Sequence, residues 1–212
     1  MAARATVNGR PLALAAAALT AFAALGAAID RWGPWGWDRG WQSGPALLAL
    51  WRAVTHLGDV PAYLILCLAL LLAGVTIARV RRAAIATVAG LPLLWRIGDL
   101  AKELFHRSRP PGWHGVIETS YSYPSGHAEL SLFFYGAIAL WVIGPYLSAP
   151  RRRGLFLFGG LVVCLLSASR VALGVHYLTD LLGGWLLATG WLAIVGTVAR
   201  LWPVRRRAAL SG

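Results

Sequence analysis

Six apolar runs, each close to the length that crosses a lipid bilayer, constrain this chain most. A helix rises about 1.5 Å per residue, so about 20 residues cross a hydrocarbon core of roughly 30 Å. Of the 212 residues, 58% are hydrophobic and 13% are charged, which argues against an ordinary soluble domain. We predict an all-α integral membrane bundle of six transmembrane helices, forming a single domain over residues 1–212. The predicted spans are residues 11–29, 61–77, 83–100, 130–147, 155–172 and 181–201.

Two of these runs leave room for another interpretation. In the third run, Arg96 and Asp99 interrupt the far end, where their spacing allows them to pair one helical turn apart. The first run has small residues around 24–28, as a cleaved signal peptide would. Its apolar stretch exceeds the usual signal-peptide length of roughly 7 to 15 residues, so we expect a retained first helix.

The charges are sorted by connection in a way that predicts the topology. With a cytoplasmic N-terminus, that side carries twelve arginines and no acid: Arg4, Arg10, Arg79, Arg81, Arg82, Arg151, Arg152, Arg153, Arg200, Arg205, Arg206 and Arg207. The opposite side and its helix ends carry eight cations and all eight acids: Arg31, Arg39, Arg52, Arg96, Lys102, Arg107, Arg109, Arg170, Asp30, Asp38, Asp59, Asp99, Glu103, Glu118, Glu129 and Asp180. The positive-inside rule then predicts a multi-pass inner (plasma) membrane protein with both termini cytoplasmic. Topology also accounts for the net charge of +12, so we predict no nucleic-acid partner.

Between the first two runs lies an outward-facing segment, residues 30–59, that is rich in glycine and tryptophan. It contains five of the eleven tryptophans, and indole rings favour the headgroup region of a bilayer. Residues 46–56 form either a short amphipathic helix lying along the outer interface or a plain structured loop.

Most of the polar residues suited to phosphate chemistry fall in three short segments. They are Lys102–Pro110 (KELFHRSRP), Tyr123–His127 (YPSGH) and Ser169–Asp180 (SRVALGVHYLTD). The prolines predict that the third helix ends before Pro110 and that the fourth begins near Ser125. A helix start there would direct free backbone N–H groups toward a bound anion.

These segments contain the groups that phosphate-ester hydrolysis needs. Lys102, Arg109 and Arg170 are suited to a cationic cradle, which Ser125 and the backbone N–H of Gly126 would complete. His176 and Asp180 are four residues apart, so they share one face if the last helix begins near His176. The carboxylate would then orient the imidazole and leave one ring nitrogen free to attack phosphorus.

The order and spacing of the three segments resemble the type 2 phosphatidic acid phosphatase (PAP2) family of membrane lipid phosphatases. The resemblance implies that His176 becomes a phosphohistidine, that Asp180 supports it and that His127 is the general acid. It also implies a membrane lipid phosphate as substrate, with undecaprenyl diphosphate, phosphatidylglycerophosphate and phosphatidic acid as candidates, and no cofactor. The charge distribution puts this site on the periplasmic, extracytoplasmic side. A phosphotransferase and a catalytically silent lipid-binding or transport protein are the alternatives, and the oligomeric state stays open.

Other reactive side chains receive no catalytic role. His56, His106 and His114 lie outside the motif positions, and we expect Glu118 and Glu129 to be solvated. No metal site is predicted, because the sequence lacks an HExxH pattern and fixed cations repel a divalent ion. We expect Cys67 and Cys164 to be buried, unpaired small side chains.

Overall fold

The computed structural model describes residues 9–111 and 118–201, and every regular element within these ranges is a helix. Each of six long apolar stretches overlaps one predicted span, so the prediction of an all-α, six-span membrane bundle is confirmed. The helices of the six spans are α1 (Gly9–Trp32), α3 (Val60–Thr76), α4 (Arg81–Phe105), α5 (Gly126–Ala137), α6 (Ala149–Ala172) and α7 (Leu178–Leu201). A 3-10 turn, η1 (Gly36–Arg39), and a short helix, α2 (Pro45–His56), lie between α1 and α3.

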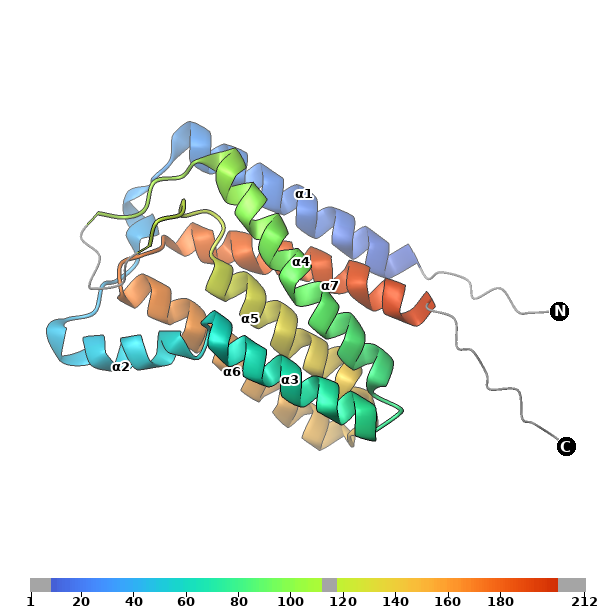
Figure 1. Ribbon diagram of the computed structural model, residues 1–212. Helices are drawn as coiled ribbons and strands as arrows, with labels where there is room; N and C mark the ends of the chain where they lie inside the picture. The colour runs from blue at the N-terminus through green and yellow to red at the C-terminus, as the bar shows by residue number, and fades with distance from the viewer. Residues whose placement is uncertain (1–8, 112–117, 202–212) are drawn as a thin grey trace, which may run out of the picture.

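The helices place all three motif segments at one end of the bundle. In Figure 1, α1, α4 and α6 end there, and α5 and α7 begin there. The opposite end holds the start of α1, the α3–α4 connection, the start of α6 and the end of α7. Arginines occupy each of those positions, so the charge sorting in the sequence corresponds to the two ends of the fold.

Of the two alternatives for residues 46–56, the helix is correct. Twelve residues rise only about 18 Å, which is too short to cross a bilayer. A turn at residues 57–59 separates α2 from α3, and α2 packs against α6 at the end of the bundle that carries the motifs (Figure 1).

The third span is longer than predicted. The two polar residues do not end it, since α4 continues to Phe105. Arg96 and Asp99 form the expected pair, with Nη1 3.8 Å from Oδ2. The helix stops at His106, which has a left-handed φ of 47° and donates its N–H to Lys102 O at 3.0 Å. This turn directs the following arginines across the end of the bundle.

The fourth span is not one continuous α-helix, as the apolar run at 130–147 predicted. After α5 comes a π-helical segment, η2 (Ile138–Val142), followed by a 3-10 turn, η3 (Gly144–Tyr146). Ile143 N donates to Ile138 O at 2.9 Å, the five-residue hydrogen bond that defines the π segment. Hydropathy does not distinguish these helix types.

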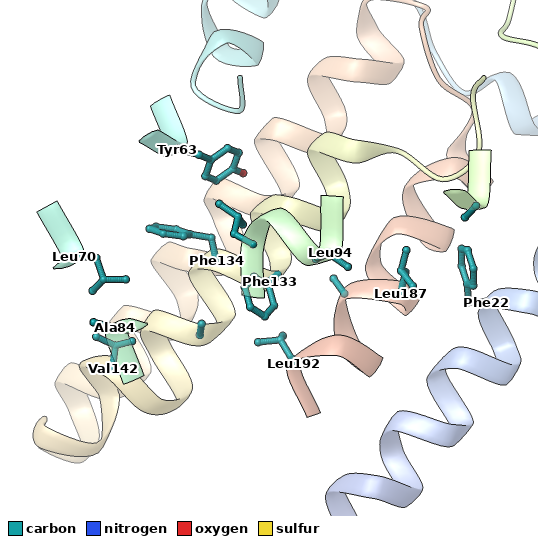
Figure 2. Close-up of a cluster of buried hydrophobic side chains, with 14 of the residues drawn as sticks. Phe22, Tyr63, Leu70, Ala84, Leu94, Phe133, Phe134, Val142, Leu187 and Leu192 are labelled. Atoms are coloured by element: carbon teal, nitrogen blue, oxygen red, sulfur yellow. The ribbon is translucent and has the colours of Figure 1, made fainter. Parts of the chain in front are cut away.

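The apolar core forms around α7, which packs against both α1 and α5. Figure 2 shows Phe133 and Phe134 of α5 in this core with Leu94 of α4 and Leu187 of α7. The outer face of the bundle is also apolar, with many large aliphatic side chains exposed, as lipid contact requires.

Two glycines of α7 allow the loop before α5 to lie directly on the helix. A Cβ at Gly184 would lie 2.7 Å from Ser125 O, and one at Gly183 would overlap the ring of Tyr123. Tyr123 is fully buried and donates its hydroxyl to Phe22 O at 2.8 Å. This close approach fixes the second motif against the helix that follows the third.

The cysteines are unpaired but not both buried. Cys67 is half-buried, whereas Cys164 is exposed on the outer face of α6, so the prediction of a buried side chain is wrong for Cys164. Its position on a lipid-facing surface suits a small apolar residue equally well.

Candidate active site

Backbone hydrogen bonds connect the three motif segments. Ser125 N donates to Asp180 O at 3.0 Å, which ties the start of α5 to the start of α7. Ser122 N donates to Arg107 O at 2.8 Å, which ties the same loop to the segment after α4. Val175 N donates to Arg170 O at 3.0 Å and closes the turn between α6 and α7. Residues far apart in sequence are therefore held as one unit.

His176 and Asp180 form a buried pair, although not on one helical face. α7 begins at Leu178, so His176 precedes the helix rather than opening it, and the conditional expectation of a shared face does not apply. Nδ1 of His176 still lies 3.2 Å from Asp180 Oδ2. Asp180 also accepts from Tyr177 N at 2.8 Å, as a carboxylate in the first turn of a helix often does.

The contacts of His176 define its tautomer. Nε2 lies 3.1 Å from Nη1 of Arg109, and a guanidinium only donates, so Nε2 carries the lone pair and Nδ1 carries the hydrogen. Burial lowers the pKa of His176 well below its ordinary value, and repulsion from Arg109 and Arg170 lowers it further. The ring is therefore neutral at pH 7, with Nε2 directed toward the cations.

A second set of residues supports Asp180, and sequence reasoning missed it. Arg107 Nη1 donates to Asp180 Oδ1 at 2.5 Å, and its Nη2 donates to Asp38 Oδ2 at 2.5 Å. Ser122 Oγ donates to Asp180 Oδ2 at 2.5 Å. Thr179 N donates to Asp38 Oδ1 at 2.9 Å. All of these side chains are buried, so η1 contributes an acid to the base of the site.

Arg109 is held by main-chain carbonyl groups. Its Nε donates to Ser120 O at 2.8 Å and its Nη1 to Val175 O at 2.9 Å. Ser120 Oγ lies 3.1 Å from Arg109 Nη2 and 3.5 Å from Lys102 Nζ, so this hydroxyl bridges two of the predicted cradle residues. Lys102 Nζ lies close to Gly126, since a Cβ added to that glycine would be 4.0 Å from it.

Arg170, in the last turn of α6, is the third of the predicted cradle residues. It is almost fully buried, and its Nη1 donates to Thr55 Oγ1 at 2.8 Å. Its Nε and the hydroxyl of Ser125 are buried polar atoms that have no hydrogen-bond partner among the described residues. Buried donors without a partner are costly, so an anionic ligand at this position would satisfy both.

Glu118 lies in this site, which corrects the expectation of a solvated acid. One carboxylate oxygen contacts Arg170 Nη2, and the other lies 3.3 Å from Arg109 Nη2. Burial raises the pKa of Glu118, but attraction to Arg170 and Arg109 outweighs it and holds the pKa below its ordinary value. An ionised carboxylate thus binds the two guanidinium groups that the sequence assigns to phosphate.

Comparison with known protein families gives a match over nearly the whole chain. The sequence profile of the PAP2 superfamily matches residues 12–203. The chain belongs to the PAP2 superfamily. The resemblance carried by the three motifs is therefore confirmed, and it includes the first helices, which contain none of the motifs.

Two curated relatives are phosphatases by name. Phosphatidylglycerophosphatase B of Bacillus subtilis (strain 168) is 32% identical over 151 residues, covering 68% of this chain and 70% of the relative. Undecaprenyl-diphosphatase of Sulfolobus acidocaldarius is 30% identical over 123 residues, covering 55% of each chain. With this family and these relatives, the chain is a membrane phosphatase.

Two solved structures have a similar fold. The transmembrane PAP2 type phosphatidylglycerolphosphate phosphatase from Bacillus subtilis matches with a TM-score of 0.66 and 26% identity, covering 92% of this chain and 95% of that one. LpxE of Aquifex aeolicus matches with a TM-score of 0.51 and 16% identity, covering 87% and 94%, which shows the fold alone.

His127 is the remaining motif histidine, and the other residues below are ones to which the sequence assigned no catalytic role. His127 is largely buried at the start of α5 and contacts Asp59. His106 caps α4 with its ring against Tyr121, and His114 lies outside the described residues. Glu129 is almost fully buried against Gly98, so the expectation that it is solvated is wrong.

No group of three or more potential metal ligands occurs in the part of the chain that the structure describes. The acidic side chains near the site are each bound to cations or histidines, as Glu118, Asp180 and Asp59 illustrate. This donor set is suited to anion binding rather than to a divalent cation.

Proposed function

We propose that this phosphatase hydrolyses a membrane lipid phosphate or diphosphate through a phosphohistidine on His176. The observation that carries the proposal is the pair of contacts at its ring. Nδ1 is anchored on Asp180, and Nε2 presents its lone pair toward Arg109. An oriented, neutral imidazole among fixed cations is the arrangement that attack on phosphorus requires.

The first step forms the bond between His176 Nε2 and phosphorus and breaks the bond from phosphorus to the leaving oxygen. Arg109, Arg170 and Lys102 stabilise the charge on the nonbridging oxygens, and Ser125 Oγ and the Gly126 N–H donate to them. His127 gives a proton to the leaving oxygen. In the second step His127 takes a proton from water, which attacks phosphorus and releases phosphate and free His176.

The position of the site supports an extracytoplasmic reaction. It lies at the bundle end that carries the acids and the tryptophan-rich segment, opposite the arginine-rich connections.

Undecaprenyl diphosphate is the favoured substrate, followed by phosphatidylglycerophosphate and phosphatidic acid. The names of the two curated relatives refer to the first two of these lipids.

A substrate panel tests this function. Purified protein in detergent is given each candidate lipid with and without EDTA, and free phosphate is measured. Release that persists in EDTA supports metal-independent hydrolysis. Transfer of labelled phosphate to an added alcohol in place of water would identify a phosphotransferase, and absence of both would identify a silent lipid-binding protein.

Vanadate is expected to inhibit competitively and to bind at least about 100-fold more tightly than inorganic phosphate, because its five-coordinate form resembles the transition state. Steady-state inhibition by both ions measures the ratio. Arg170→Gln should remove most of the difference in affinity between the two ions. The Arg96 side chain is 69% exposed, so Arg96→Gln should retain this difference. Equal affinity for the two ions would contradict the proposed cradle.

Glu118→Gln is expected to lower KM about 10-fold with little change in kcat. The neutral amide should bind Arg109 and Arg170 less strongly than the carboxylate does, so substrate phosphate displaces it at a lower concentration. Initial rates with a short-chain lipid phosphate give both constants. Glu103→Gln, an exposed acid on α4, is the matched control, and a raised KM for Glu118→Gln would show that the carboxylate assists binding.

A further inference from the structure

The turn between α2 and α3 places an acid beside His127. Asp59 occupies the position before α3 where an aspartate usually caps the helix, yet its side chain makes no capping hydrogen bond. Its Oδ1 instead lies 3.1 Å from His127 Nε2, and its Oδ2 lies 2.7 Å from His56 Nδ1. The carboxylate therefore interacts with histidines instead of the helix start.

The surroundings of His127 specify which ring nitrogen carries the fixed hydrogen. Nε2 faces two acceptors, Asp59 Oδ1 and, at 3.2 Å, the main-chain oxygen of Thr55. A carbonyl oxygen only accepts, so Nε2 is the donor. Nδ1 makes no hydrogen bond to a described residue, which leaves it as the nitrogen able to exchange a proton with a bound ligand.

The backbone of the same turn limits how the ring can rotate. A Cβ at Gly58 would lie 2.6 Å from His127 Cδ2, closer than real side chains approach. One side of the imidazole thus rests against Gly58, while Nε2 is bound at its edge. Two neighbouring residues of a turn outside all three motifs hold this histidine in a single orientation.

We propose that Asp59 is a positioning residue for His127, so that the enzyme has a second carboxylate–histidine pair for its general acid. This rests on the proposed function, in which His127 protonates the leaving oxygen. The carboxylate orients Nδ1 toward that oxygen. Its negative charge also stabilises the imidazolium and offsets repulsion from Arg170, which is nearby because Arg170 and His127 both contact Thr55. The proton leaves from Nδ1 to the leaving oxygen and returns to Nδ1 from the attacking water.

Substrates with different leaving groups separate positioning from a structural effect. A lipid alkoxide is a poor leaving group and needs protonation, whereas p-nitrophenolate leaves without it. Asp59→Asn should lower kcat for the lipid phosphate about 30-fold and for p-nitrophenyl phosphate less than about 3-fold. Asp30→Asn, an exposed acid near the end of α1, is the matched control and should change neither rate.

Two further variants complete the test. Gly58→Ala leaves the carboxylate in place but displaces the ring, so it should show the same dependence on the leaving group. Adding Asp59→Asn to His127→Ala should cause no further loss, because the residue that Asp59 positions is already absent. Equal losses on both substrates, or an additive loss in the double variant, would overturn the proposal. Absence of wild-type phosphate release would instead refute the proposed function itself.

Discussion

His176→Asn is expected to reduce phosphate release from lipid phosphate at least about 10⁴-fold. Removal of a nucleophile leaves only the contributions of binding and charge stabilisation, and losses of this size follow in other covalent mechanisms. The asparagine amide can still donate to Asp180, so the buried network of Arg107 and Ser122 keeps its hydrogen-bond partners. The variant should therefore bind inorganic phosphate and lipid with nearly unchanged affinity, which equilibrium binding in detergent measures.

A matched substitution and a trapping experiment complete this test. His106→Asn changes an exposed histidine at the same end of the bundle, and asparagine tolerates its left-handed backbone, so full activity is expected. Rapid acid quenching of wild-type enzyme with labelled substrate should retain little label, because phosphohistidine is acid-labile, whereas alkaline quenching should retain it. Undiminished phosphate release by His176→Asn would exclude His176 as the nucleophile.

Arg107→Gln is expected to destabilise the protein by about 3 to 5 kcal/mol, the usual result of removing one partner from a buried ion pair. Arg107 separates two fully buried carboxylates, Asp38 and Asp180, at 2.5 Å from each. Without the guanidinium the two negative charges face each other in a site shielded from water. The thermal midpoint in detergent should fall by roughly 10 °C, and kcat should fall with it because Asp180 no longer orients His176.

The neighbouring Arg39 provides the control for this substitution. Arg39 is exposed in the same 3-10 turn as Asp38, so Arg39→Gln should shift the midpoint by less than about 2 °C. Arg107→Gln combined with Asp38→Asn should recover part of the lost stability, because the second substitution removes one of the unpaired charges. An unchanged midpoint for Arg107→Gln would show that the network contributes little.

Fold class and the location of the motifs could be read from the sequence because they depend on local patterns. Apolar length predicts spans, and prolines and spacing predict the loop that enters α5 at Ser125. Details that depend on packing could not be read in this way. The π segment after Ala137, the exposure of Cys164 and the burial of Glu129 are three such details.

The candidate site divides in the same manner. Motif spacing and side-chain chemistry predict Lys102, Arg109 and Arg170 as phosphate ligands, and the fold brings Arg109 and Arg170 together on Glu118. The supporting acids lie far from the motifs and carry no sequence signal of their role. Asp38 is 69 positions from Arg107 and Asp59 is 68 from His127, so only the fold brings them together.

The sequence by itself therefore determined that this chain is a six-helix membrane protein of the PAP2 type, with its reactive residues at one end. Hydropathy, charge sorting and motif spacing are properties of single segments, which the chain retains before it folds. The tertiary structure alone decided that Asp59 pairs with His127 and that Glu118 binds the cradle arginines. Such pairings join segments that are far apart in the sequence, and their physical cause is that buried charges must find partners wherever packing places them.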